Sequence, residues 1–399
     1  MALEPRVSVV MSVYNGAKYL REAIDAILAQ TFSQFELIIV DDGSTDGTIE
    51  ILCAYSDPRI RLIRNDRNLG PAVARNRAFA EARGEYIAIQ DADDASVPNR
   101  LAVQVAYFDA HPDVALLGAT VLYVQTNDNF AAVFPGYPHF DFDRVVGADA
   151  LMAAHQPMYD TAWLSISTEA PRKALVVSPL SNLSAKWALL SHCSFCNTSV
   201  MFRRKLYDQL GGFPEQAQYR YCEDYELFSR YARHARVANL APMLVTWRAH
   251  ETSTSYRNED RQRQQVNDVA KSNLCWVMGW EEMDSLLWSA WRKFWYTPGI
   301  SPVPFSAREV EVLSEFLPRL TSAFYVAYDL HGEEVGRHRR EMHYMWARHA
   351  FGLAYRGGPG RNLRARIGLT VLGAKLLWKT MMPAVANRAT EAKPSSTDQ

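Results

Sequence analysis

The sequence predicts an α/β protein in which a mostly parallel, mixed sheet carries helices on both faces and a mainly α-helical region follows it. Two observations support this prediction. Short apolar runs alternate with segments of helical spacing from Val7 to Val121, and the runs are continuous, which is typical of strands buried on both faces. Beyond Tyr256 the strand pattern stops, so we expect helices from there on.

The predicted strands are rich in apolar residues and are Val7–Tyr14, Phe35–Val40, Ile60–Arg64, Tyr86–Gln90 and Val114–Val121. The predicted helices begin at Lys18 and then span Ile49–Tyr55, Pro71–Arg83 and Leu101–Asp109. Parallel sheets of this kind bind their ligands beyond the carboxyl ends of the strands. We therefore expect one rim of the sheet to carry Tyr14, Asp41, Asp42 and Asp91–Asp94.

The composition excludes several classes of protein. Of the 399 residues, 48% are apolar and the formal net charge is −1, which excludes a disordered chain and gives no overall nucleic-acid footprint. The five scattered cysteines do not suggest a disulfide framework and favour a reducing compartment. The N-terminus lacks the regions of a signal peptide, and no apolar run is long enough to span a bilayer. We therefore expect a cytoplasmic location.

The segment Glu85–Arg100 brings three acids to the end of one predicted strand. Asp91, Asp93 and Asp94 follow the apolar run directly. Clustered carboxylates repel one another unless a cation or a proton lies among them. Hard divalent cations such as Mg²⁺ or Mn²⁺ bind one or two carboxylates together with substrate phosphates. The segment indicates a metal that holds a diphosphate, and capping of the next helix by Asp91 and Asp94 is the alternative that the pattern leaves open.

The absence of known nucleotide-binding motifs limits the classes of ligand that this rim can bind. The turn after the first strand, SVYNGAKYL, lacks the glycines of a dinucleotide site, and no GxxxxGK[ST] phosphate loop occurs. Asp42–Gly47 resembles the start of a calcium loop, but Cys53 stands where such a loop needs Glu. A carboxylate beside an aromatic ring, such as Asp42 beside Tyr14, can instead accept the N–H of a pyrimidine base. Turn formation and helix capping are the alternative for these aspartates, and Asp46 is expected to do only that.

Residues 1–110 resemble the family 2 glycosyltransferases of the GT-A fold. The matching segments are VSVVMSVYNGAKYL, LAQTFSQFELIIVDDGSTDGT, NLGPAVARNRAFAEARGEYIAIQDADD and PNRL. The resemblance implies a nucleotide-sugar donor of the UDP, GDP or TDP type, inversion at the anomeric carbon and a divalent cation, Mn²⁺ or Mg²⁺. It assigns contacts with the donor to Ser12, Tyr14, Asp42, Arg75 and Asp91. Arg75 would lie near the base or the phosphates, Asp91 nearer the ribose, and Asp93 would bind the metal.

The second half of the predicted catalytic domain carries an irregular stretch. Phe130–Ala188 is interrupted by prolines, and we expect it to form part of a binding surface or lid for the acceptor. A loop that runs into a strand, Ser199–Phe202, follows it. Cys193 and Cys196 form a CxxC pair there, but no second ligand pair occurs at zinc-site spacing, so small buried residues are favoured over zinc.

Glu223 and Asp224 lie at the predicted start of a helix that extends to Tyr231. A helix N-terminus favours a carboxylate and lowers its pKa. Helix capping is one interpretation of the two acids. A general base is the other, because a positioned carboxylate can remove the proton of a sugar hydroxyl as the attack proceeds. The segment resembles the GGF…ED motif of the family, which assigns the base to Asp224.

Leu244–Ser255 resembles the YRxHxxSxS segment of the family, with Trp247 where Tyr is common. The resemblance implies that His250 completes the coordination of the metal or contacts the diphosphate. An ordinary loop hydrogen bond is the alternative for His250, and Arg248 faces phosphates or pairs with a surface acid. No QxxRW motif and no multiple membrane spans occur, which favours addition of one sugar per event over processive synthesis.

The C-terminal third reads as helices over Glu259–Trp276, Glu309–Tyr328 and Arg364–Met382. Five tryptophans crowd this region: Trp276, Trp280, Trp288, Trp291 and Trp295. They are more typical of a helical core, or of a cover for the acceptor site, than of a nucleic-acid platform. The last helix is basic and amphipathic. This pattern leaves open a peripheral contact with a membrane, packing on the same chain, or a homo-oligomer. Residues 389–399 form a polar tail that we expect to be disordered.

Together these observations predict a glycosyltransferase that moves one sugar from a nucleotide-diphosphate sugar to a hydroxyl of a saccharide or lipid-linked acceptor. The predicted domains are a GT-A domain over 1–255, with a donor half at 1–110 and an acceptor half at 111–255, and a helical region over 256–388. We expect no nucleic-acid partner, and a role in surface polysaccharide or glycoconjugate biosynthesis. A non-catalytic sugar-nucleotide binding protein and a nucleotidyltransferase are the alternatives.

Overall fold

The computed structural model describes residues 4–125, 139–140, 162–167, 172–253, 257–296, 305–356 and 363–381. The chain divides into two compact units, residues 1–274 and 275–399. The division falls within α11 (Glu259–Met278). The side chain of Asn273 ties this helix to the first unit, because it donates to Leu189 O at 2.7 Å and to Ser229 Oγ at 2.9 Å. The predicted domain boundaries at residues 255 and 388 stay predictions. The predicted disordered tail lies outside the described residues.

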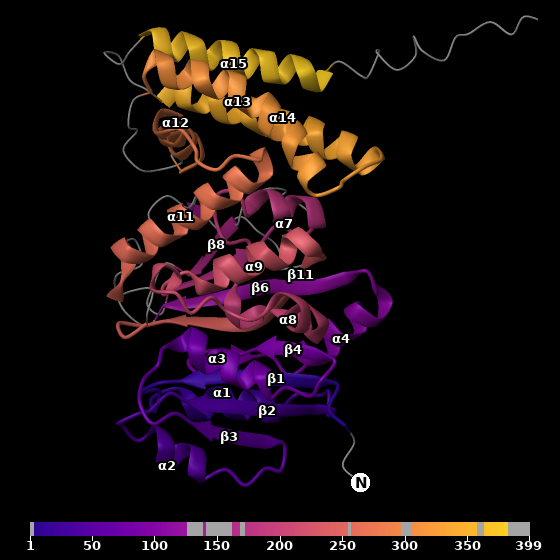
Figure 1. The fold of residues 1–399 in the computed structure, drawn as a ribbon, viewed down its shortest axis with the longest axis vertical. Coiled ribbons are helices and arrows are strands. Elements are labelled where there is room, and N and C mark those ends of the chain that lie inside the picture. Colours follow the sequence, from indigo (N-terminus) through magenta and orange to yellow (C-terminus); the bar gives the residue numbers. More distant parts are fainter. Residues whose placement is uncertain are drawn as a thin grey trace, which may run out of the picture. The chain divides into compact units, whose positions relative to one another are not determined.

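The first unit is built on a mixed sheet (Figure 1), of which eleven strands lie in the described part of the chain. Its N-terminal strands are β1 (Val7–Val13), β2 (Phe35–Asp41), β3 (Ile60–Arg64) and β4 (Tyr86–Ile89). They pair in parallel in the order β3-β2-β1-β4. The four strands and their parallel pairing were predicted from the apolar runs, and the prediction is confirmed. Their carboxyl ends therefore meet at one edge of the sheet.

The sheet continues beyond β4 with a change of direction. The strand β10 (Met201–Arg203) runs antiparallel to both β4 and β6 (Val114–Gln125). The long strand β11 (Arg236–Ala249) lies parallel to β6 and antiparallel to β5 (Ala95–Ser96). This pairing holds the end of β11 against the segment that follows Asp91–Asp94, so two parts of the chain far apart in sequence meet at the sheet rim.

The sequence predicted no regular structure over Phe130–Ala188, and this prediction is wrong for the described part of that stretch. It contains β7 (His139–Phe140), β8 (Ala162–Ser167), β9 (Arg172–Val177) and α7 (Asn182–Ala188). The strand β9 pairs with the outer edge of β6, and β8 pairs with β9. Short strands of this kind depend on pairing with an existing edge, which the local pattern does not show. The rest of the stretch lies outside the described residues.

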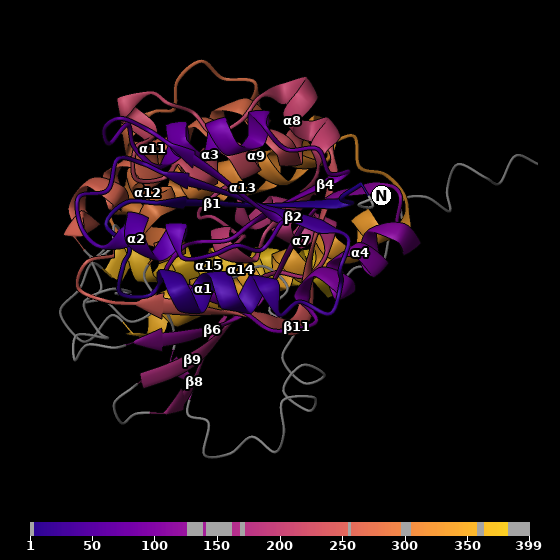
Figure 2. The same ribbon diagram turned by 90° about the horizontal axis from the view of Figure 1, so that it is seen from below.

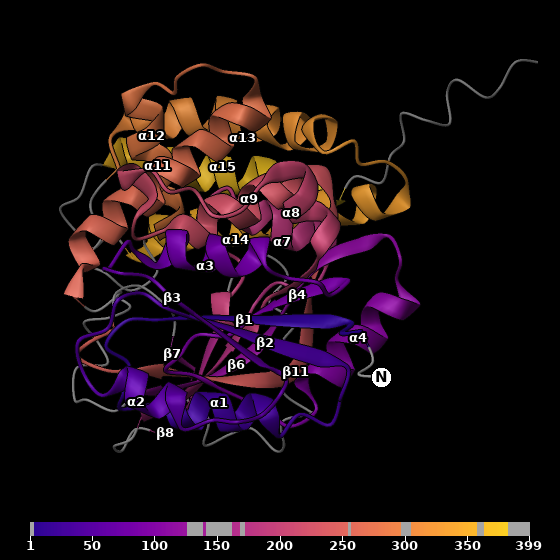
Figure 3. The same cartoon turned by 60° about the horizontal axis from the view of Figure 1, so that its bottom comes forward.

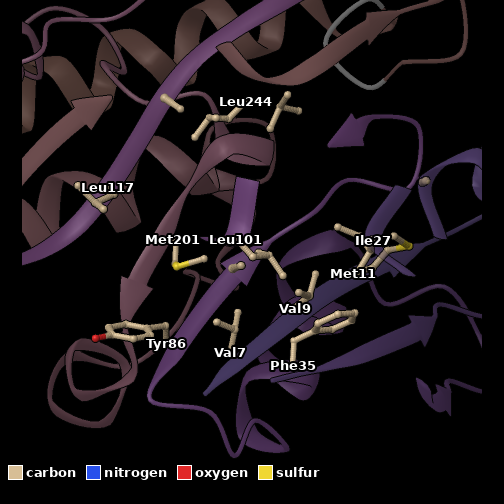
Figure 4. Packing of buried hydrophobic residues seen from close by; sticks show 14 of the residues in the cluster. Val7, Val9, Met11, Ile27, Phe35, Tyr86, Leu101, Leu117, Met201 and Leu244 are labelled. Atoms are coloured by element: carbon tan, nitrogen blue, oxygen red, sulfur yellow. The ribbon is translucent and has the colours of Figure 1, made fainter. Parts of the chain in front are cut away.

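Helices cover both faces of the parallel strands (Figures 2 and 3). The helices α1 (Leu20–Leu28), α2 (Thr48–Cys53) and α4 (Arg100–Ala110) cover one face. The helices α3 (Pro71–Ala80) and α9 (Glu223–His234) cover the other. On the first face, Val9 and Met11 of β1 pack with Ile27 and Leu101 (Figure 4). On the second, Phe79 of α3 meets Phe202, which in turn meets Tyr231 of α9, with ring centroids 5.5 and 5.3 Å apart.

The second unit is helical and comprises α12 (Ser285–Tyr296), α13 (Ala307–Ala327), α14 (Glu333–Arg356) and α15 (Leu363–Met381). A capping box between Ser306 and Glu309 begins α13. Trp291 is buried, stacks on Trp295 and meets Phe316 edge-on, so the predicted core role is confirmed for Trp291. Within the described ranges, no helix has both the length and the apolar character that crossing a bilayer requires.

A buried arginine joins β4, β10 and α4 at the centre of the first unit. Arg100 is fully buried and donates to the backbone carbonyls of Ile89 and Val200 at 2.8 and 3.3 Å. Its guanidinium also donates to Gln90 Oε1 and Gln104 Oε1, both at 3.1 Å. Burial without a carboxylate in hydrogen-bond contact lowers the pKa of Arg100 to about 10. The residue is therefore a structural donor that satisfies carbonyls at the strand ends.

We expect Arg100→Met to lower the free energy of unfolding by about 2–5 kcal/mol, because it leaves several buried acceptors without a donor. Urea denaturation followed by circular dichroism measures the change. Arg261→Met replaces an exposed arginine of α11 and serves as the matched control, for which we expect a change within about 0.5 kcal/mol. Equal stability of the two variants would show that the buried hydrogen bonds of Arg100 contribute little.

Candidate functional site

The carboxyl ends of β1 and β2 are joined by hydrogen bonds between their loops. Asn15 adopts a positive φ of 52°, and its backbone N–H donates to Ser44 Oγ at 2.9 Å. Its side-chain oxygen accepts the backbone N–H of Thr45 at 2.8 Å. Ser12 near the end of β1 is half-buried, and the ring of Tyr14 just beyond it is 48% exposed. The sheet rim thus presents an open aromatic face beside the loop that follows β2.

Asp42 anchors the loop that leads into α3. One of its carboxylate oxygens accepts from Asn65 Nδ2 at 2.7 Å, and the other accepts the backbone N–H of Gly70 at 2.8 Å. The backbone N–H of Leu69 lies within 3.1 Å of both oxygens. Asp42 is 3% exposed. The structure therefore gives this residue a clear role in shaping the loop, and its predicted contact with a nucleoside stays a prediction.

Arg75 of α3 lies between acids from two distant segments. Its guanidinium donates to Asp91 Oδ1 at 2.8 Å and to Glu223 Oε1 at 3.0 Å. The guanidinium also lies 5.3 Å from the ring centroid of Phe213. Burial disfavours the charge of Arg75, but Asp91 and Glu223 outweigh this effect and raise the pKa of the guanidinium. The charged arginine therefore links the acid-rich loop after β4 to the N-terminus of α9.

The two acids at the start of α9 have raised pKa values. Burial raises the pKa of Glu223 to about 7, against the opposing effect of Arg75 and with a contribution from the charge of Asp224. Burial also raises the pKa of Asp224, although its Oδ1 accepts the backbone N–H of Tyr225 at 2.8 Å. The prediction of a lowered pKa at this helix N-terminus is wrong, because burial outweighs the helix dipole.

Asp93 lies in contact with His250, which follows β11. The distance from Asp93 Oδ2 to His250 Nε2 is 2.9 Å, and His250 Nδ1 lies 2.8 Å from Thr252 Oγ1. The ring of Tyr19 packs against the imidazole with centroids 4.9 Å apart. The sequence named Asp93 and His250 as the two metal ligands, and the structure brings these residues together from positions 157 apart in the chain.

Asp94 secures the same loop from its buried side. Its Oδ1 accepts the backbone N–H of Arg248 at 2.8 Å. Burial raises the pKa of Asp94 well above its ordinary value, and the neighbouring charges of Asp93 and Asp91 add to this effect. The Arg248 side chain pairs with Glu22 at 2.8 Å, as one of its two predicted roles required. The three acids of the loop therefore have three different environments.

The residues present fit a divalent cation of the Mg²⁺ or Mn²⁺ type. Asp93 and His250 offer a carboxylate and an imidazole whose Oδ2 and Nε2 atoms lie 2.9 Å apart, and both types of ligand bind Mn²⁺. In the described part of the chain, no cluster of three or more His, Cys, Asp or Glu side chains is arranged to hold a metal ion. Two protein ligands are enough for cations that take their remaining ligands from phosphates and water.

Sequence reasoning missed Asn197 as part of this site. Its side-chain amide donates to both carboxylate oxygens of Asp91 at 3.1 and 3.2 Å, and the backbone N–H of Asp91 donates to Thr198 Oγ1 at 3.3 Å. In the surrounding segment, HCSFCNTSV, only the cysteines were considered as possible ligands. Glu223 was noted only as a neighbour of Asp224, whereas the structure shows that it pairs with Arg75. Neither partner has a local signal in the sequence.

Comparisons with known proteins place part of this chain beside glycosyltransferases. Residues 8–155 match the model of the family described as "Glycosyl transferase family 2". The putative glycosyltransferase EpsE of Bacillus subtilis is 32% identical over 230 residues, which cover 57% of this chain and 66% of EpsE. The succinoglycan biosynthesis protein ExoO of Rhizobium meliloti is 43% identical over 106 residues, 27% of this chain and 30% of ExoO. The chain therefore spans less than two thirds of either relative.

A solved structure overlaps with most of the chain. The structure titled "Crystal structure of S. aureus TarS 1-349 in complex with UDP-GlcNAc" aligns with a TM-score of 0.47 and 18% identity, and covers 94% of this chain and 91% of that one.

We expect Glu223→Gln to change how stability depends on pH. An acid whose pKa is raised in the folded state stabilises the fold below its unfolded pKa and loses that contribution as the pH rises through the folded value. For Glu223 this window runs from 4.5 to about 7. The free energy of unfolding of the variant, relative to wild type, should therefore rise across this window, by about 1.4 kcal/mol for each unit of pKa shift.

Urea denaturation at several pH values tests this expectation. Glu50→Gln replaces an exposed acid of α2 and provides the control, which should keep the pH dependence of the wild type. If Glu223→Gln followed the wild type in parallel at every pH, the raised pKa of Glu223 would be contradicted.

Proposed function

We propose that this chain, which carries a glycosyl transferase family 2 domain over residues 8–155, transfers one sugar from a nucleotide-diphosphate sugar to an acceptor hydroxyl. The observation that carries the proposal is the pair of hydrogen bonds from Arg75 to Asp91 and to Glu223. They bring a predicted general base, Asp224, to the same rim of the sheet as the acids of the loop after β4. Donor site and base are then parts of one site.

The proposed donor site lies at the carboxyl ends of β1, β2 and β4. Ser12, Tyr14 and Asp42 would contact the nucleoside, with the exposed ring of Tyr14 as the face on which a base stacks. Arg75 would lie near the phosphates and Asp91 near the ribose. Arg75 is suited to phosphate because its planar guanidinium can donate two parallel hydrogen bonds to an anion. A donor of the UDP, GDP or TDP type follows from the family resemblance.

The proposed cation site consists of Asp93 and His250. A divalent cation there would supply Lewis-acid stabilisation of the leaving diphosphate. Thr252 Oγ1 lies 2.8 Å from His250 Nδ1 and would keep the imidazole oriented, while the ring of Tyr19 supports its face. Asp94 holds the loop in place through the Arg248 backbone N–H. These residues bind and orient, and they move no proton in the proposed reaction.

Asp224 is the proposed general base. Its raised pKa suits a group that must accept a proton from a hydroxyl near neutral pH, because a carboxylate of ordinary pKa is a weaker base. Asp224 would take the acceptor's hydroxyl proton while the acceptor oxygen bonds to the anomeric carbon and the bond to the diphosphate breaks on the opposite side, which gives inversion. Glu223 would hold Arg75 in position beside it. The acceptor would be a saccharide or lipid-linked molecule in surface polysaccharide or glycoconjugate biosynthesis, in line with the name of the relative ExoO, a succinoglycan biosynthesis protein.

We expect Asp224→Asn to lower kcat for sugar transfer by about 10²–10⁴, the usual contribution of a general base, and to leave donor affinity nearly unchanged. Nucleotide release from a panel of sugar nucleotides, with calorimetric donor binding, measures both quantities. Asp208→Asn changes an exposed acid of α8 and is the control. Full transfer activity in Asp224→Asn would remove Asp224 from the role of base.

We expect Asp93→Ala to weaken binding of a nucleoside diphosphate in Mn²⁺ by at least about tenfold and to have little effect in EDTA. Loss of a metal ligand lowers only the part of the nucleotide affinity that depends on the metal. Isothermal titration with and without Mn²⁺ measures the difference, with Asp66→Ala, an exposed acid, as the control. Unchanged affinity in Mn²⁺ would contradict the proposed metal site.

The products separate the proposal from its two alternatives. A glycosyltransferase releases a nucleoside diphosphate, whereas a nucleotidyltransferase releases pyrophosphate. A non-catalytic binding protein releases neither, even slowly in the absence of an acceptor.

A further inference from the structure

The second unit contains a cavity of about 320 Å³ between α13 and α14. Its lining residues are Pro318, Thr321, Ser322, Arg339, Arg340 and His343. None of these six side chains is acidic, and two of them are arginines. The volume is at the lower end of those found for ligand sites. The lining is therefore cationic, and nothing in the proposed transfer reaction uses it.

Neither Arg339 nor Arg340 forms an ion pair or hydrogen bond with another described residue. Both side chains are exposed, whereas Lys293 pairs with Glu309 at 2.6 Å and Arg308 pairs with Glu311 at 2.7 Å elsewhere in the second unit. The guanidinium of Arg339 instead lies 5.1 Å from the ring centroid of Tyr325. A guanidinium over a ring keeps all its N–H groups available for a ligand. The two arginines are therefore positive charges without a partner, at the wall of a cavity.

The helices hold this wall in a defined position. The hydroxyl of Tyr325 on α13 lies 2.8 Å from His338 Nδ1 on α14, and both side chains are buried. His343 is also buried, one turn beyond the arginines. Thr321 Oγ1 donates to the backbone carbonyl of Leu317 at 2.8 Å. The contact between Tyr325 and His338 therefore joins the two helices that flank the cavity, so a ligand would meet a preformed site.

The charge of the surrounding sequence favours an anion. From residue 338 to the C-terminus the chain has eleven Arg and Lys residues and three Asp and Glu residues. Arginine matches the oxygen geometry of phosphate better than that of halide or other simple anions, because its fork can donate two parallel hydrogen bonds. The hydroxyls of Thr321 and Ser322 already donate to the backbone carbonyls of Leu317 and Pro318. The two adjacent arginines are therefore the donors that suit a phosphoryl or pyrophosphoryl group.

We propose that the cavity between α13 and α14 binds a phosphoryl or pyrophosphoryl group through Arg339 and Arg340, carried either by a lipid headgroup or by a free molecule. The site goes beyond the proposed sugar transfer and does not depend on it.

Calorimetric titration with inorganic pyrophosphate in EDTA tests the proposal. The chelator removes metal-dependent binding at the donor site. Wild type is compared with the double variant R339Q/R340Q and with Arg337→Gln, an exposed arginine of α14 that does not line the cavity. We expect wild type and Arg337→Gln to bind pyrophosphate alike. The double variant should bind about tenfold more weakly or worse, because each lost charge-assisted hydrogen bond weakens binding by about that factor.

Sedimentation with vesicles distinguishes the two sources of the phosphate. Vesicles of phosphatidylcholine with phosphatidylglycerol are compared with phosphatidylcholine alone, for the same three proteins. A lipid headgroup is identified if wild type binds the anionic vesicles, R339Q/R340Q does not, and pyrophosphate displaces wild type from them. Pyrophosphate binding without vesicle binding identifies a free ligand. The proposal is overturned if the three proteins behave alike in both assays, whether all bind or none does. Thermal unfolding of each variant confirms that the fold is retained.

Discussion

The rest of the site depends on the ion pairs that Arg75 forms. Asp91, Glu223 and Asp224 gather in a poorly solvated space, where three carboxylates would repel one another. Arg75 offsets this repulsion by pairing with two of them at 2.8 and 3.0 Å. A buried ion pair contributes specificity of arrangement more than net stability, and its loss leaves uncompensated charge. The arginine therefore links the start of α9 to the loop after β4.

The acid-rich loop after β4 is held from three sides, and each contact comes from a different part of the chain. Asp91 accepts from Arg75 and Asn197, Asp93 meets His250, and Asp94 accepts the backbone N–H of Arg248. The parallel pairing of β11 with β6 delivers the last two contacts, because it carries the end of β11 to the rim. A loop held in this way presents its carboxylates without the freedom to move apart, which is what a preorganised site requires.

The parallel strands and the rim residues could be predicted from the sequence, since continuous apolar runs and acids at strand ends are local signals. The strand pair β8–β9 could not, because β9 depends on the edge of β6 and β8 depends on β9. Asn197 was missed for a similar reason, since its partner Asp91 lies 106 residues away. The raised pKa of Glu223 could not be predicted either. The helix N-terminus is visible in the sequence, but the burial that outweighs it is not.

The most direct test of the account is a crystal structure with Mn²⁺ and a nucleoside diphosphate, measured at a wavelength where manganese scatters anomalously. The account predicts one anomalous peak within bonding distance of Asp93 and His250, with the diphosphate on the same metal and Asp224 facing the open side of the rim. A metal peak that contacts neither residue, or a nucleotide bound away from the ends of β1, β2 and β4, would contradict it.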